Sequence, residues 1–122
     1  MATLVVNGGR DIITNRIKGA GTEPNFVSVG TGAGTTALTD TTLFTEVETR
    51  VAGTSSRVTT STTNDTYQVV GTVSITATRA LTNAGLFDAV SAGNLFAKGD
   101  FATINLVSGD SLQETWKVQI TS

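Results

Sequence analysis

The chain contains 122 residues, 24 of which are threonine, and it has neither histidine nor cysteine. These two absences exclude disulfides and the serine–histidine and cysteine–histidine pairs of nucleophilic enzymes, so we expect a protein that is not an enzyme. A net charge of -2, from eight basic and ten acidic residues scattered singly, disfavours nucleic acid as a partner. Without a long apolar run or a secretory signal, we expect one soluble domain made in a cytoplasm, with no membrane partner.

The N-terminal part of the chain is predicted to form a short strand followed by a helix. The strand covers Ala2–Val6, and the helix covers Arg10–Lys18. Ile13 and Ile17 lie four residues apart, which places them on one helical face, and Gly19 supplies a C-terminal stop.

Residues 1–9 have two alternative interpretations. Met1–Asn7 followed by Gly8-Gly9 could be a free arm that adds a strand to the sheet edge of a partner. It could equally be an ordinary edge strand of the domain formed by residues 10–122. In the first case, the residues that contact the partner would be Leu4, Val5 and Val6.

Most of the remaining chain is predicted to form antiparallel strands. Apolar and polar side chains alternate through Thr66–Thr78, with the threonines on the polar parity, which indicates a strand with one buried and one wet face. The C-terminal segment repeats this pattern, with Leu112, Trp116, Val118 and Ile120 on the apolar parity. Further strands are predicted at Asn25–Val29, Thr45–Val51, Ser56–Thr62, Leu95–Phe101 and Ala102–Val107, with turns at Asn64-Asp65, Ser91–Asn94 and Ser108–Asp110. The expected fold is all-β: an antiparallel sandwich or barrel with one short N-terminal helix.

Two features of the central region concern loops. The cluster Gly30-x-Gly32-x-Gly34 resembles a phosphate-binding loop, but no lysine follows at the required spacing, so we interpret it as a loop within the domain. Asp40 is predicted to cap a single turn over Thr41–Phe44.

Carboxylates and aromatic residues are the remaining candidates for a site. Glu46 and Glu48 share strand parity, and with Asp40 they could form the acid pair of a glycosidase. The solvated face of an exposed strand explains them better. Trp116 is predicted to be a core or interface anchor; alternatively, with a second aromatic from Phe87, Phe96 or Phe101, it could form the platform of a carbohydrate-binding module. We expect no cofactor and no metal centre, although a calcium site with oxygen ligands alone stays open.

Several segments, taken in order, resemble a group of small virion proteins of tailed bacteriophages. The similarity extends over nearly the whole chain from Leu4 onward, and the order of the short motifs makes it specific. The motifs are Phe26–Gly32, Thr39–Leu43, Thr45–Arg50, Asn83–Asp88, Leu95–Lys98 and Trp116–Val118.

The resemblance implies an all-β structural protein of the virion, either a head decoration (cement) protein or a tail-associated, neck or fibre protein. It also implies that Gly30, Gly32, Gly85, Leu86 and Phe87 are turn or core positions. A fibre needs an attachment region, a shaft and a tip, and this chain has no heptads for a shaft. We therefore expect a decoration protein, a homotrimer that binds the major capsid protein on the outside of the head and stabilises its lattice.

Overall fold

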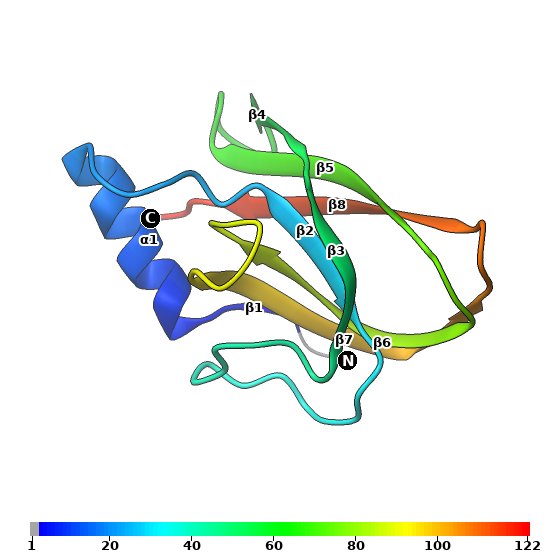
Figure 1. Cartoon of the computed structure of the whole chain (residues 1–122). Helices are drawn as coiled ribbons and strands as arrows, with labels where there is room; N and C mark the ends of the chain where they lie inside the picture. The colour runs from blue at the N-terminus through cyan, green and yellow to red at the C-terminus, as the bar shows by residue number, and fades with distance from the viewer. Residues whose placement is uncertain (1–2) are drawn as a thin grey trace.

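The computed structural model describes residues 3–122, which form two antiparallel sheets and one short helix (Figure 1). This confirms the all-β class and the single N-terminal helix. The five-stranded sheet has the order β1-β7-β6-β2-β3, and the three-stranded sheet has the order β4-β5-β8. The elements are β1 (Thr3–Val5), α1 (Asn7–Lys18), β2 (Phe26–Gly30), β3 (Glu46–Ala52), β4 (Thr54–Val58), β5 (Thr66–Ser74), β6 (Arg79–Phe87), β7 (Leu95–Leu106) and β8 (Ser111–Gln119).

The core lies between the two sheets, where the alternation of β5 turns apolar side chains inward. Val69 and Val73 are fully or almost fully buried, whereas Thr72 is exposed, as the alternation predicts. Thr66 is an exception because it is buried, and its hydroxyl is hydrogen-bonded to the side chains of Thr60 and Asp65. Thr66 has the same parity as the exposed Thr72, and its burial on this outer face is tolerated because local partners satisfy its hydroxyl.

The helix α1 begins three residues earlier than predicted, at Asn7, and includes Gly8 and Gly9. A Cβ atom on Gly9 would collide with the backbone carbonyl of Phe96, so glycine is what allows the first turn of α1 to lie directly against β7. Gly19 ends the helix in the left-handed conformation, as predicted, with φ of 86°.

The segment before α1 is an edge strand that pairs with its own sheet. β1 pairs antiparallel with β7, so that Leu4 lies opposite Lys98 and Val5 opposite Ala97. Leu4 and Val5 are half-buried and Val6 is fully buried, so Val6 is not accessible to a partner while β1 is docked. The boundary expected after residue 9 falls inside α1. The part of the predicted arm formed by residues 1–2 lies outside the described residues.

Several strand predictions need correction. β6 was not expected, because its alternation is hidden: Asn83 through Phe87 are buried on both faces of the sheet. Residues 95–106 form one strand, β7, where two were predicted. Its first half is buried and its second half is largely exposed, so the residue pattern changes partway along a single strand. β5 ends at Ser74 and not at Thr78. The predicted turns at residues 91–94 and 108–110 do join β6 to β7 and β7 to β8.

Candidate interaction surfaces

The three carboxylates that suggested a glycosidase pair do not form one. β3 contains a bulge opposite Ser28 of β2, and Glu48 adopts a positive φ of 65° there, which breaks the shared parity with Glu46. Glu46 forms an ion pair of 2.7 Å with Arg50. Glu48 instead accepts hydrogen bonds from Thr76 and pairs with Arg79 at 3.1 Å. The backbone N–H of Thr76, followed by its hydroxyl and Arg79, holds the pKa of Glu48 below its usual value.

The third carboxylate, Asp40, holds the long loop between β2 and β3 against β7. It accepts the backbone N–H of Ala37 and a 2.9 Å bond from the ammonium of Lys98, so it does not cap Thr41–Phe44 as predicted. Lys98 is fully buried and lies 3.2 Å from the centroid of the Phe44 ring. Burial opposes ionisation of Asp40, but the Ala37 N–H and Lys98 outweigh it and lower the pKa. The contacts among Asp40, Lys98 and the Phe44 ring therefore have a structural role: they attach the loop to β7.

The glycine-rich segment is a loop, as predicted. Gly30 ends β2, and residues 31–37 are irregular, with no helix at whose N-terminus a phosphate could bind. A Cβ atom on Gly32 would lie 2.8 Å from the backbone carbon of Phe44, so close packing requires glycine there. Among residues 3–122, no group of three acidic side chains is arranged to hold a metal ion.

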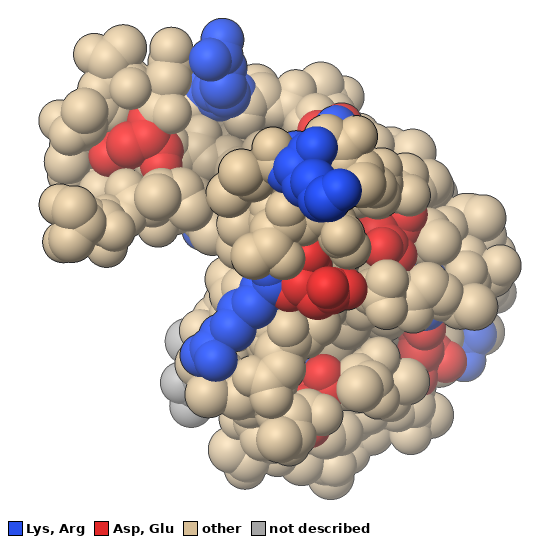
Figure 2. All heavy atoms as spheres, turned by 90° about the vertical axis from the view of Figure 1, so that its left-hand side faces the viewer, with Lys and Arg blue, Asp and Glu red and all other residues tan. Residues whose placement is uncertain are grey.

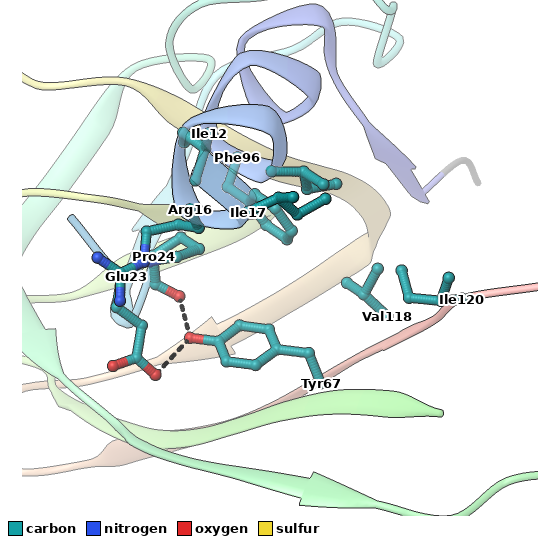
Figure 3. Close-up of a pocket in the computed structure, with 10 residues that line it drawn as sticks. Ile12, Arg16, Ile17, Glu23, Pro24, Tyr67, Phe96, Val118 and Ile120 are labelled. Carbon is teal, nitrogen blue, oxygen red and sulfur yellow. Dashed lines mark hydrogen bonds between the residues drawn. The ribbon is translucent and has the colours of Figure 1, made fainter. Parts of the chain in front are cut away.

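An apolar groove of about 410 Å³ lies between α1 and the ends of β5 and β8 (Figure 3). The C-terminus of the chain lies close to α1 (Figure 1). Ile17 is 81% exposed on one side of the groove and Ile120 is 62% exposed on the other. Tyr67 lies across its floor, where its hydroxyl donates to the carbonyl of Pro24 (2.8 Å) and the carboxylate of Glu23 (3.1 Å). Burial, followed by the charge of Glu23, raises the pKa of Tyr67, which therefore stays neutral.

The face of the molecule that carries α1 has no dominant sign of charge. Figure 2 shows this face, where basic and acidic side chains are interspersed among uncharged residues and the surface is hollowed. A partner would therefore be held here by apolar contact more than by charge.

Trp116 lines a second pocket, of about 270 Å³, between β8 and the β1, β6 and β7 strands of the other sheet. Of its three candidate aromatic neighbours, only Phe101 lies at this pocket. Phe96 instead packs edge-on against Tyr67, with a centroid distance of 6.3 Å, and Phe87 lies under the guanidinium of Arg50. Trp116 is half-buried against the main core.

Glu114 also lines this pocket, although it was not predicted from the sequence as a site residue. It is 8% exposed, and its Oε1 accepts a 2.8 Å hydrogen bond from the indole Nε1 of Trp116. Its Oε2 makes no hydrogen bond to the described residues. Burial raises the pKa of Glu114 to about 8, and the Trp116 hydrogen bond offsets only part of this effect. The signal was present in the sequence, since Glu114 has the same parity as Leu112 and Trp116 and therefore points inward.

Among the described residues, no helix is long and apolar enough to cross a bilayer. No protein-family model matches the chain, and neither the curated proteins nor the solved structures contain a significant match to it.

Proposed function

We propose that the chain is a virion structural protein of a tailed bacteriophage, a decoration protein that binds the outside of the capsid as a homotrimer and stabilises the lattice of the major capsid protein. The ordered motifs described above suggest this class of protein. The structural observation that supports it best is the apolar groove between α1 and β8, because an exposed apolar surface on an all-β scaffold is suited to binding another protein.

The arrangement of charges favours a binding role over a catalytic one. Asp40, Glu46 and Glu48 each pair with a different cation of the same chain, so they lie in separate structural contacts. The indole N–H of Trp116 is already bonded to Glu114, which does not favour a carbohydrate platform. Surfaces therefore remain the best candidates for function.

The groove supplies the contact with the capsid in this proposal. Ile17 and Ile120 are large apolar side chains held on a helix and at the end of a strand, so docking requires little reordering of the backbone. A ligand that binds the assembled lattice but not free subunits stabilises the lattice by mass action. Decoration would therefore raise the temperature at which heads disassemble.

The test is co-sedimentation of the purified protein with undecorated, expanded heads, followed by a measurement of their heat resistance. We expect the wild type to bind and Ile17→Asp to lose most of the binding, because the charge enters an apolar contact. Val107→Asp is the matched control: Val107 is also exposed (54%) but lies in the turn between β7 and β8, at the opposite end of the molecule (Figure 1).

The number of copies of the protein per virion distinguishes a head protein from a tail protein. A decoration protein should be present in hundreds of copies per virion by quantitative mass spectrometry, whereas a tail, neck or fibre protein should be present in a few. Protein that co-purifies with tails and does not bind heads would contradict the proposal. Sedimentation velocity tests the homotrimer.

A further inference from the structure

We propose that the pocket lined by Glu114 and Trp116 binds a protonated alkylamine or alkylguanidinium group, the chemistry that a lysine or arginine side chain of a protein partner presents. This inference does not depend on the identity of the partner or on a role in a virion.

The pocket contains a buried acceptor with no partner. Glu114 is 8% exposed, its Oε1 is bonded to Trp116, and its Oε2 is buried without a hydrogen bond to the described residues. Buried carboxyls in proteins are nearly always paired, because an unsatisfied polar atom costs free energy. Glu114 lines a pocket of about 270 Å³, so a group bound in this pocket would lie beside a carboxyl that has one bonding position unused.

The surrounding strands supply no cation to this carboxyl. None of the described residues that line the pocket with it is charged. On the neighbouring strands, Lys98 is bonded to Asp40, Arg79 is bonded to Glu48, and Asp100 accepts a backbone hydrogen bond. β1 and β5 carry no charged residue, and Lys117 of β8 is exposed with the opposite strand parity to Glu114. A positive group at the buried carboxyl would therefore come from outside the described chain.

The walls of the pocket favour a cation carried on an apolar stem. Phe101, Ile104 and Leu112 provide apolar contacts for methylene groups, and the Trp116 ring can attract a cation over its face. A cation beside Glu114 favours the ionised carboxylate, so binding should release a proton when the pH is below about 8. The affinity should therefore increase with pH and level off near pH 8.

The experiment uses n-butylammonium as the probe and n-butanol as a neutral analogue of the same shape. Trp116 is the only tryptophan of the chain, so its indole N–H resonance and its fluorescence report on this pocket alone. With five non-hydrogen atoms, n-butylammonium should bind with a Kd on the order of 1 mM at pH 8.5, at which it is still protonated. We expect a preference of about tenfold or more over n-butanol.

The pH dependence gives a second measurement on the unmodified protein. Below pH 8, the affinity for n-butylammonium should fall about tenfold per pH unit, in proportion to the ionised fraction of Glu114. The probe should also lower the midpoint at which the indole resonance titrates. Glu114→Gln keeps an acceptor for Trp116 but removes the charge, so it should abolish both the preference for the amine and the pH dependence.

Equal binding of n-butanol and n-butylammonium, or an affinity for the amine that does not change between pH 6 and pH 8.5, would overturn the proposal even if Glu114→Gln failed to fold. If the proposal holds, sedimentation velocity identifies the source of the cation. Self-association that Glu114→Gln abolishes indicates a second copy of the chain, whereas a wild-type monomer that binds the probe indicates a different protein.

Discussion

Glu114 should make the protein less stable as the pH rises through neutrality, which is unusual for a carboxyl group. Its pKa is about 8 in the folded protein, compared with 4.5 for an ordinary glutamate. Between these values the folded state binds more protons than the unfolded state, so the free energy of unfolding falls with pH. The slope approaches about 1.4 kcal/mol per pH unit, so from pH 5 to pH 7 the loss is about 2–3 kcal/mol. The stability contributed by the protonated carboxyl is fully present below about pH 4.5 and is lost by about pH 8.

Urea denaturation of the wild type and of Glu114→Gln, at half-unit intervals from pH 5 to pH 8.5, measures this effect. The variant should show a nearly flat profile over this range and should be more stable than the wild type above pH 7. In thermal melts, the wild-type Tm should fall by roughly 10 °C between pH 5 and pH 7. The lowered pKa values of Asp40, Glu48 and Asp65 affect stability mainly at more acidic pH, so they do not obscure the effect of Glu114 between pH 5 and pH 8.5. A wild-type profile as flat as that of the variant would refute the reasoning.

Three further predictions concern stability. Asp40→Ala should destabilise the protein by about 3 kcal/mol in urea denaturation, because it leaves the buried Lys98 ammonium unpaired, whereas Lys98→Met should cost less because Asp40 can be hydrated. Gly85→Ala should cost about 1–3 kcal/mol in the same assay, because its Cβ would lie 2.6 Å from the Cδ2 of Leu43; a neutral effect would contradict the close packing. Asp65→Ala should lower the Tm at pH 7, because the carboxylate accepts backbone N–H groups of the loop before β5. The Tm difference from the wild type should narrow as the pH falls below 3.8, because the unfolded wild-type chain then binds a proton at Asp65 while the folded state, whose Asp65 pKa is lowered, keeps the carboxylate ionised.

The sequence predicted the elements whose two faces meet different environments. β5 and β8 each have one face on the core and one in water, so their alternation is visible from the residue pattern. β6 lies in the middle of the larger sheet, and the loop between β2 and β3 covers its other face. The side chain of Asn83 bonds to both the backbone N–H and the carbonyl of Phe44 in that loop, so a polar residue is buried there without any local signal.

The candidate sites likewise divide into those that a local residue pattern predicts and those that depend on the folded chain. The bulge at Glu48 depends on a positive φ that a glutamate rarely adopts, so strand parity placed its carboxylate on the wrong face. The groove between α1 and β8 joins residues from opposite ends of the chain, which no local pattern relates. Glu114 is different, because its parity within β8 was enough to place it inside the protein.

The pairing of β1 with β7 has a consequence for the order in which the chain folds. The hairpins β4–β5 and β6–β7 join segments that are close in sequence, so they can form early at little cost in loop entropy. Thr3, in contrast, lies opposite Gly99, and α1 packs on the same strand. Residues 3–5 must therefore wait until β7 has been synthesised before they can pair, and until then their own backbone groups and apolar side chains stay open to other strands.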